Sequence, residues 1–375
     1  MEKYNKKNRE LIMKKICFFV GNLNNSGGTE RVCTIIANYL SKLNYEIIIL
    51  NLNQGDSPFF TLNKKILNYK LFDTNARGLS RFPFTIYKLR KFIKKNNIEI
   101  IINVDSILSL YTIPALINLN VKNICWEHFN YNVTLGKKIR FLSRILASKY
   151  SDKVIVLTNK DKIIWEKKTK SNKIIKISNP ITIPSIKEIK SIKNKEKIII
   201  AIGRLTHQKG FDLLLQSWSK ITDNYPEWKL NIIGSGEEEF TLKKIIKLKN
   251  IENSVSIIPP NKNIQKYYEQ SSYYVLSSRF EGFGLVILEA QSNGLPVIAF
   301  NCEAGPDEII IDNQTGWLCE KSNILELSEK ISKAIELFES NKTEYLIFAN
   351  NSIINSEKFS IENIIPSWIE LFDNI

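Results

Sequence analysis

The chain has 375 residues, of which 43% are hydrophobic, and its formal net charge at pH 7 is +15. This length exceeds what a single hydrophobic core usually supports, so we expect two compact α/β domains. With 15 glycines, 11 prolines and no visible internal repeat, the sequence excludes a disordered chain and a solenoid.

The cysteines and the apolar segments indicate the cellular compartment in which the protein works. Five cysteines without a C-x-x-C pair argue against a disulfide framework and a zinc site, and favour the reducing cytoplasm. The start, MEKYNKKNRELIMKK, is too polar for a signal peptide, so the residues before Met13 are interpreted as an extension or as the product of an upstream start. Polar residues interrupt the apolar stretch 98–121, so no transmembrane helix is predicted.

The charge is unevenly distributed along the chain. Residues 1–180 contain 32 Lys and Arg against 12 Asp and Glu, a balance of +20, whereas the remainder contains 21 against 26, a balance of −5. Such asymmetry predicts that the first half faces a polyanion, either a membrane surface or a nucleic acid. No nucleic-acid-binding motif accompanies the charge, which favours an anionic membrane surface over a nucleic acid as the partner.

Short apolar runs typical of buried strands recur along the whole chain. In the first half they lie at 16–20, 46–51, 98–104, 123–126 and 153–157, and in the second at 197–202, 228–234, 254–258, 273–276, 296–300 and 316–319. Helical segments separate them, which predicts two parallel sheets with helices on both faces. The segment 179–196, with two prolines and many lysines, is the predicted domain boundary.

Two segments of the first half, 82–95 and 136–149, combine cations with an apolar stripe at helical spacing. The apolar positions are Ile86, Leu89, Phe92 and Ile93 in the first and Ile139, Leu142, Ile145 and Leu146 in the second; the cations of the second are Lys137, Lys138, Arg140 and Arg144. Basic amphipathic helices can lie on anionic lipid, where each cation contributes about 1 kcal/mol. Outer helices of a doubly wound domain show the same pattern with the stripe facing the sheet, so both interpretations stay open.

The most diagnostic segment is SSRFEGFGLVILEA, residues 277–290, which follows the predicted strand 273–276 and leads into a helix expected at 285–293. Open parallel sheets bind ligands at the carboxyl ends of their strands. A glycine-rich turn followed by a helix amino terminus can bind a phosphate through backbone amides, here those of Phe283, Gly284 and Leu285.

Two carboxylates, Glu281 and Glu289, flank this turn. Because a carboxylate repels phosphate, we interpret Glu289 as an acceptor of hydrogen bonds from a nucleotide ribose and Glu281 as a partner of sugar hydroxyls. The alternatives are a solvated loop residue for Glu281, and for Glu289 a surface helix residue or a charge partner of the helix amino terminus.

Arg204 and Lys209 follow the strand 197–202 in the run GRLTHQKG. A planar guanidinium and a mobile ammonium could together neutralise a diphosphate without a metal, although surface solvation would explain both equally simply. The chain contains no D-x-D and no His or Cys cluster with metal-ligand spacing, so neither a metal nor another cofactor is expected.

These motifs occur in a familiar order. GRLTHQKG, then GSG at 234–236, then E-x7-E, then NGLPVIAF, together with the early loop Gly27-Gly28-Thr29-Glu30, resemble the retaining glycosyltransferases of family four. Glu239 stands where a dinucleotide fingerprint would require its last glycine, which disfavours a nicotinamide oxidoreductase. The resemblance implies the GT-B fold, with two Rossmann-like doubly wound domains facing each other across a cleft.

The same resemblance assigns domains and residues. Residues 1–182 would form the acceptor-side domain, 193–358 the nucleotide-sugar-binding domain, and 359–375 a helix, with Trp368, that crosses back to the first domain. His128, in the text CWEHFN, would touch the transferred sugar and act in catalysis with Glu281. The implied donor-binding residues are Gly28, Arg204, Lys209, Phe283, Gly284, Leu285 and Glu289, and the implied acceptor-side residues are Gly27, Glu30 and Arg31.

The segment NCEAGPDEII, residues 301–310, resembles a variant common among bacterial surface-polysaccharide transferases. The resemblance thus implies a metal-independent retaining hexosyltransferase of O-antigen or capsule-type assembly at the inner face of the cytoplasmic membrane. Its expected donor is a UDP-hexose or UDP-N-acetylhexosamine, and its expected acceptor a polyprenyl-diphosphate-linked glycan. A GDP-mannose-dependent mannosyltransferase, a non-catalytic GT-B scaffold that binds nucleotide-sugars, and a basic nucleic-acid-binding protein are the alternatives.

Overall fold

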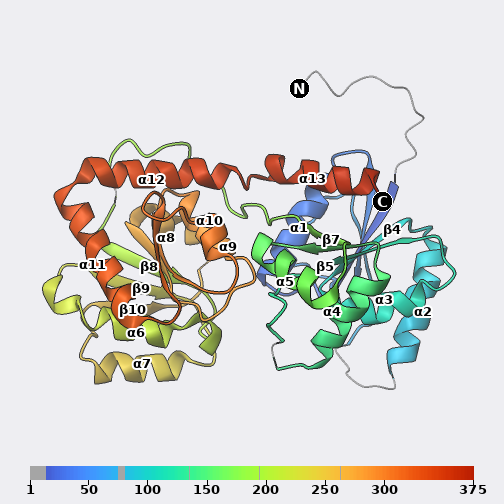
Figure 1. Ribbon diagram of the computed structural model, residues 1–375, viewed down its shortest axis with the longest axis horizontal. Coiled ribbons are helices and arrows are strands. Elements are labelled where there is room, and N and C mark those ends of the chain that lie inside the picture. The colour runs from blue at the N-terminus through green and yellow to red at the C-terminus, as the bar shows by residue number, and fades with distance from the viewer. Residues whose placement is uncertain (1–13, 75–80, 135, 194, 262) are drawn as a thin grey trace. The chain divides into compact units, whose positions relative to one another are not determined.

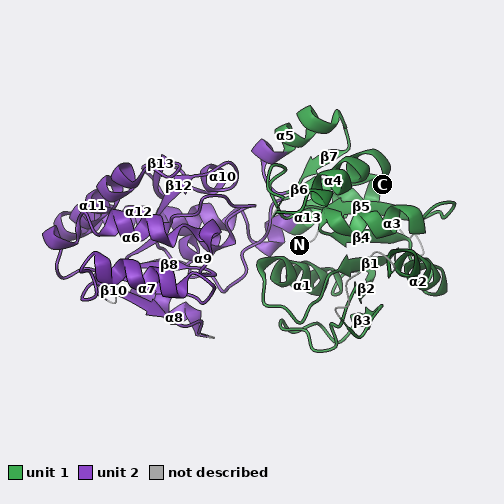
Figure 2. Cartoon of the chain, turned by 90° about the horizontal axis from the view of Figure 1, so that it is seen from below, with its two compact units in different colours: residues 1–156, 162–177, 365–375 green, residues 157–161, 178–364 purple. Residues whose placement is uncertain are grey.

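The computed structural model describes residues 14–74, 81–134, 136–193, 195–261 and 263–375, so the predicted extension before Met13 lies outside the described residues (Figure 1). The chain divides into two compact units (Figure 2). Unit 1 comprises 1–156, 162–177 and 365–375, and unit 2 comprises 157–161 and 178–364. Each unit has its own parallel sheet, so the predicted fold class of two doubly wound α/β domains is confirmed.

Unit 1 contains a seven-stranded parallel sheet in the order β3-β2-β1-β4-β5-β6-β7. The strands are β1 Lys14–Val20, β2 Tyr45–Asn51, β3 Leu67–Lys70, β4 Ile100–Val104, β5 Lys122–Trp126, β6 Lys153–Val156 and β7 Ile174–Lys176. The inner strands are nearly continuous apolar runs because both of their faces are covered. The sequence pattern missed the two edge strands, since β3 is mostly exposed and polar and β7 has three residues.

Helices cover both faces of this sheet. They are α1 Gly28–Leu40, α2 Arg81–Lys95, η1 Ser106–Leu108, α3 Ser109–Ala115, α4 Ile139–Tyr150, α5 Asn159–Thr169 and α13 Ile361–Asp373. Cys17 and Phe19 pack in one apolar cluster with Leu89 of α2. Phe18 points to the opposite face, where its ring centroid lies 6.4 Å from that of Trp368 in α13. Successive side chains of β1 thus point to opposite faces of the sheet and pack against different layers of helices.

Unit 2 contains a six-stranded parallel sheet in the order β10-β9-β8-β11-β12-β13. The strands are β8 Ile198–Ile202, β9 Lys229–Ile233, β10 Val255–Ile258, β11 Tyr273–Leu276, β12 Val297–Asn301 and β13 Gly316–Glu320. The helices are η2 His207–Lys209, α6 Phe211–Trp218, η3 Thr222–Asn224, α7 Glu239–Leu248, α8 Ile264–Gln270, α9 Leu285–Gln291, α10 Pro306–Ile309, α11 Ile324–Ser340 and α12 Lys342–Glu357. All six strands predicted in the second half are present. Strands β8 and β11 are parallel neighbours in the centre of the sheet, so the motifs that follow them lie side by side at the carboxyl ends of the strands.

The sequence also predicted that the chain has no disulfide framework and no transmembrane helix. All five cysteines are buried and free. Among the described helices, none combines the length and the apolar character that crossing a bilayer requires.

Candidate active site

Two loops of unit 2 leave neighbouring strands at their carboxyl ends, 203–210 after β8 and 277–284 after β11. The backbone amide of Arg279 donates to the carbonyl of Gln208 at 2.8 Å, and the Gln208 side-chain amide donates to the carbonyl of Phe280 at 3.1 Å. These reciprocal hydrogen bonds fix each loop against the other.

Gly210 is required where the loops meet. Its φ is +63°, and a Cβ at this position would lie 2.1 Å from the carbonyl oxygen of Ser277. Just beyond it, Asp212 accepts a bidentate pair of hydrogen bonds from Arg279, at 2.8 and 2.6 Å. The start of α6 is therefore joined to the loop that contains Glu281.

Lys209 and Glu281 form the centre of this arrangement. The Lys209 Nζ donates to Glu281 Oε1 at 2.7 Å, and the Ser278 hydroxyl donates to the same oxygen at 2.6 Å. Glu281 is buried, so it is not a solvated loop residue. Within the described part of the chain no group donates a hydrogen bond to its second oxygen, Oε2. An ammonium has three N–H donors, so Lys209 keeps two for another partner.

Arg204 lies on the same loop and is exposed. None of the described residues forms a hydrogen bond or an ion pair with its side chain. The backbone next to it is held by the GSG segment, because a Cβ on Gly234 would lie 1.9 Å from the carbonyl oxygen of Gly203, and one on Gly236 would lie 2.3 Å from that of Leu205. These two glycines thus allow the GSG segment to pack closely against the loop 203–210.

Glu289 lies on α9 and is buried, so it is not a surface helix residue. Its Oε1 accepts a hydrogen bond from the Thr182 hydroxyl, and its Oε2 accepts one from the Tyr268 hydroxyl at 2.9 Å. Sequence reasoning missed both hydroxyls because they come from a boundary segment and from a polar helix without a motif. The two hydroxyls engage both oxygens of Glu289 and fix the orientation of its carboxylate.

The entrance to α9 has the backbone that the glycine pattern predicted. Gly284 occupies the N-cap position with φ +95°. Phe283 is buried and packs edge-to-face on Phe359, and a Cβ on Gly305 would lie 2.2 Å from the Phe283 carbonyl oxygen. The helix begins at Leu285 as expected and ends at Gln291, two residues earlier than predicted.

His128 lies in unit 1, directly beyond β5, with its ring centroid 4.5 Å from that of Trp126. The side chain is buried, and its Nε2 has no hydrogen-bond partner among the described residues. Burial lowers the pKa of His128 to about 4, and the neighbouring carboxylate of Glu127 opposes this shift only in part. The imidazole is therefore neutral at physiological pH.

Glu127, which sequence reasoning did not single out, holds the His128 loop. Its Oε1 accepts hydrogen bonds from the backbone amides of His128 and Phe129, at 3.0 and 3.1 Å. Its Oε2 accepts from the Ser106 hydroxyl at 2.6 Å and from Arg144 Nε at 3.0 Å. The signal was available, because a carboxylate that directly follows an apolar strand needs buried donors.

The predicted acceptor-side residues lie at the start of α1. Gly27 is the N-cap, Gly28 is the first helical residue, and the Glu30 carboxylate folds back over Gly27. The Arg31 guanidinium lies 5.2 Å from the centroid of the Phe60 ring. Because β1 and β5 run parallel, these residues lie at the same edge of the seven-stranded sheet as His128.

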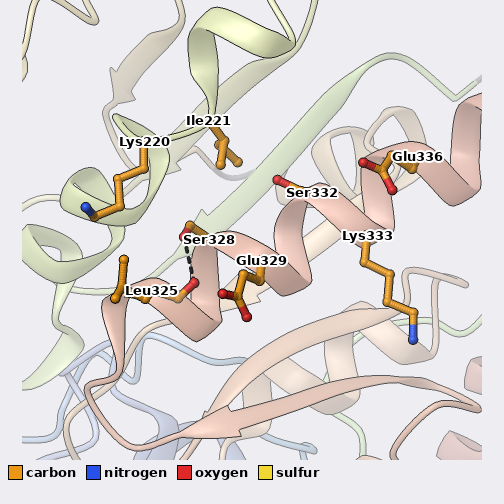
Figure 3. Close-up of a pocket in the computed structure, with 8 residues that line it drawn as sticks. All are labelled: Lys220, Ile221, Leu325, Ser328, Glu329, Ser332, Lys333 and Glu336. Carbon is orange, nitrogen blue, oxygen red and sulfur yellow. Dashed lines mark hydrogen bonds between the residues drawn. The ribbon is translucent and has the colours of Figure 1, made fainter.

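One open hollow lies elsewhere on unit 2, beside α11 (Figure 3). Its lining residues are Lys220, Ile221, Leu325, Ser328, Glu329, Ser332, Lys333 and Glu336. They include none of the predicted site residues, and their mixed charges suggest no particular ligand. In the ranges that the structure describes, no group of three His, Cys, Asp or Glu side chains is placed to hold a metal ion.

Comparison with known proteins agrees with this geometry. Residues 26–183 match the family model described as Glycosyltransferase Family 4, and residues 182–347 match the one described as Glycosyl transferases group 1. A Haemophilus influenzae protein described as an uncharacterized glycosyltransferase is 40% identical over 95% of this chain and 99% of its own length.

Two further relatives have specific names. The amylovoran biosynthesis glycosyltransferase AmsD of Erwinia amylovora is 28% identical over 96% of this chain and all of its own. The Campylobacter jejuni protein named GalNAc-alpha-(1->4)-GalNAc-alpha-(1->3)-diNAcBac-PP-undecaprenol alpha-1,4-N-acetyl-D-galactosaminyltransferase is 28% identical over 97% of this chain and 99% of its own. Relatives of this chain thus act in bacterial polysaccharide biosynthesis, and one of them bears the name of a lipid-linked acceptor.

The fold is shared with solved structures. A Staphylococcus aureus TarM variant, determined with fondaparinux, alpha-GlcNAc-glycerol and UDP, superposes with a TM-score of 0.80 at 19% identity, over 96% of this chain and all of its own. With a full-length relative at 40% identity and two family models that together span residues 26–347, the chain belongs to the family 4 glycosyltransferases of GT-B fold.

Proposed function

We propose that this glycosyltransferase moves a hexose or an N-acetylhexosamine, with retention, from a UDP-sugar to a polyprenyl-diphosphate-linked glycan at the inner face of the cytoplasmic membrane. The observation that carries the proposal is the Lys209–Glu281 pair, at the carboxyl edge of β8 and β11, with Arg204 on the same loop and Glu289 on the following helix. This arrangement places cationic N–H donors beside the Glu281 carboxylate, whose Oε2 accepts no hydrogen bond from the described residues, as a phosphate joined to a sugar requires.

Each group has a role in this reaction. Lys209 and Arg204 neutralise the diphosphate, and the backbone amides at 283–285 bind its oxygens. Glu289 accepts hydrogen bonds from the ribose hydroxyls, and the free Oε2 of Glu281 accepts one from the sugar. The neutral imidazole of His128 offers its buried Nε2 to a hydroxyl of the transferred sugar.

In the transfer step the bond between the anomeric carbon and the diphosphate oxygen breaks, and the diphosphate keeps the electron pair. The acceptor hydroxyl attacks from the same face through an oxocarbenium-like state, and its proton passes to the departing diphosphate. Cations stabilise the charge that develops on the leaving group, so the reaction needs no metal. The loop 258–261 is our candidate for contacts with the base.

The names of the relatives support the donor and acceptor classes. UDP is present in the TarM complex, and undecaprenol-PP is part of the acceptor name of the Campylobacter jejuni enzyme. The highly basic first half of the chain suits an enzyme that meets a lipid-linked acceptor at an anionic surface.

A donor screen tests the proposal. The purified chain is heated with UDP-glucose, UDP-galactose, UDP-GlcNAc, UDP-GalNAc and GDP-mannose in turn, and we expect a UDP-sugar to raise the melting temperature most. Transfer to a polyprenyl-diphosphate glycan is then measured with and without EDTA, with the anomeric configuration of the product read by NMR. Stabilisation by GDP-mannose alone, loss of transfer in EDTA, or inversion would each contradict one part of the proposal. Donor binding without any transfer would favour the non-catalytic scaffold.

A further inference from the structure

Helix α4 of unit 1 is turned with its cations inward and its apolar side outward. Arg140 and Arg144 are buried, the latter completely. Ile139, Leu142 and Ile145 are 47%, 50% and 50% exposed. The helix that the sequence described as amphipathic thus directs its aliphatic stripe away from the sheet, opposite to the usual orientation of an outer helix.

Two carboxylates at the carboxyl ends of adjacent strands cause this orientation. Asp105, which follows β4, accepts hydrogen bonds from both terminal nitrogens of Arg140, at 3.1 and 2.7 Å. Glu127, which follows β5, pairs with Arg144. If α4 were turned to bury its aliphatic stripe, both acids would remain buried without their cations, which is strongly unfavourable. The ion pairs therefore keep the apolar face in solvent.

The helices that neighbour α4 also have large exposed apolar side chains. Helix α3 packs between α2 and α4, and the three form one layer (Figure 1). Large exposed apolar side chains on this layer include Phe84 and Tyr87 of α2, Ile117 after α3, and Phe141 and Tyr150 of α4. We call this surface, together with the outer face of α4, the α2–α4 surface. Several large exposed apolar side chains on one layer of packed helices are typical of an interaction site.

The charges around this surface are mostly positive. Residues 81–150 contain 12 Lys and Arg and three acids, Glu99, Asp105 and Glu127. Two of these acids are paired inside with the α4 arginines, and Glu99 accepts a hydrogen bond from the amide of Lys15 at the opposite end of the strand. Lys137, Lys138 and Lys149 of the α4 region are exposed. The exposed acid Asp73 lies near Lys88 of α2 and pairs with Lys70. The α2–α4 surface therefore offers apolar groups together with a large excess of cations.

We propose that the α2–α4 surface docks on an anionic phospholipid bilayer, with Ile139, Leu142 and Ile145 inserted among the acyl chains and the lysines at the headgroups. An in-plane helix with an apolar face and flanking cations suits such a boundary. A second copy of the chain does not, because two cationic surfaces would repel each other. The inference deepens the proposed function, on which it rests for the identity of the membrane-bound acceptor.

The position of α4 links docking to the site. The Arg140 guanidinium lies 4.8 Å from the centroid of the Phe129 ring, beside His128, and Arg144 donates to the carbonyls of Tyr131 and Val133. The loop that contains His128 is therefore attached to the inserted helix. A diphosphate at the headgroup level would lie close to this loop.

Sedimentation with lipid vesicles tests the proposal. The full chain is mixed with vesicles of phosphatidylglycerol and phosphatidylethanolamine or of phosphatidylcholine alone. The test variant is I139S/L142S/I145S. The matched control is I163S/I347S/I354S, which replaces three isoleucines elsewhere that are 55–62% exposed, somewhat more than the tested residues. We expect the wild type and the control to bind anionic vesicles, and the test variant to bind at least about tenfold more weakly with an unchanged melting temperature.

Other results would overturn the docking surface. These are equal binding by the test and control variants, no binding by the wild type, or a wild-type dimer that the test substitutions convert to a monomer. Transfer is measured in parallel to a short-chain soluble acceptor and to a long-chain acceptor in vesicles. Retained transfer to the soluble acceptor with reduced transfer in vesicles supports docking. If no acceptor is glycosylated but vesicle binding depends on the three residues, the proposed function fails and the docking surface stands.

Discussion

Two acid–base pairs, one in each unit, differ in how completely they are enclosed. In unit 2 the Lys209 side chain is 18% exposed and that of Glu281 is 8% exposed, whereas in unit 1 Arg144 and Glu127 are both fully buried. All three side-chain nitrogens of Arg144 donate hydrogen bonds, whereas the Lys209 ammonium donates one to the described residues and has two further N–H donors. The same chemical pair can thus serve as a fixed support or as a partner that a substrate shares.

The largest effect is expected from Arg144→Ala, which leaves Glu127 buried without its cation. We expect a loss of stability of about 3–5 kcal/mol, measured by urea denaturation at pH 7. The double variant Arg144→Met with Glu127→Gln removes both charges and should recover part of this loss. The control Arg90→Ala removes hydrogen bonds to two carbonyls on the partly exposed side of α2 and should cost about 1 kcal/mol. If Arg144→Ala lowered the free energy of unfolding no more than the control does, the Arg144–Glu127 pair would not be the fixed support described above.

Lys209→Ala should instead affect turnover. Because the partly exposed ammonium would stabilise the departing diphosphate, we expect kcat to fall by about 10²–10³ while the melting temperature changes little. The measurement is UDP release with an acceptor present. Lys220→Ala, at the end of the adjacent helix α6, is the control and should retain activity. A variant that unfolds more readily but retains kcat would place Lys209 with the structural pair.

The pH dependence of stability tests the environment of His128, which is next to the fully buried Arg144–Glu127 pair. The folded pKa of His128, about 4, lies below the usual value of about 6.5, so the neutral form stabilises the fold. This contribution is complete above about pH 6.5 and is lost as the pH falls towards 4, with a total of about 3 kcal/mol. His128→Gln should therefore reduce the difference in unfolding free energy between pH 7 and pH 4.5. The exposed His207→Gln is the matched control, and an equal response of both variants would contradict the assignment.

The smallest expected effect concerns the donor side. Tyr268→Phe removes the hydroxyl that orients Glu289, and we expect nucleotide affinity to fall by about 1 kcal/mol, or about fivefold. Titration calorimetry with the preferred nucleotide measures it, and Tyr267→Phe is the neighbouring control. Glu289→Ala should weaken binding further. Unchanged affinity in both Tyr268→Phe and Glu289→Ala would remove Glu289 from the ribose site.

Much of the fold could be predicted because buried parallel strands are apolar runs with clear ends. Strand β11 and the start of α9 at Leu285 follow directly from the sequence 273–285. The orientation of α4 could not be predicted, since one helical period accommodates both a buried and an exposed stripe. What decides it is the pairing of Arg140 and Arg144 with acids that follow two other strands, and no local pattern contains that information.

Some residues of the candidate site could likewise be predicted from the sequence, and others could not. Motifs located the loops, the glycines and the paired carboxylates, because each has a fixed spacing in one segment. The partners of those carboxylates, Thr182, Ser278 and Tyr268, come from the boundary segment, the loop itself and a separate helix. Residues that act by contact across the fold have no required spacing, so only coordinates identify them.

The hydrogen bonds between the loops 203–210 and 277–284 have a consequence for how a donor is recognised. Because Gln208 and Arg279 already fasten the loops in the folded chain, the conformational entropy of ordering them is lost during folding and not at association. In the proposed function, a nucleotide diphosphate would therefore meet a preformed site. Substitutions in 258–261, the proposed base-contacting loop, would then change the preference for a base without altering the preorganised diphosphate site.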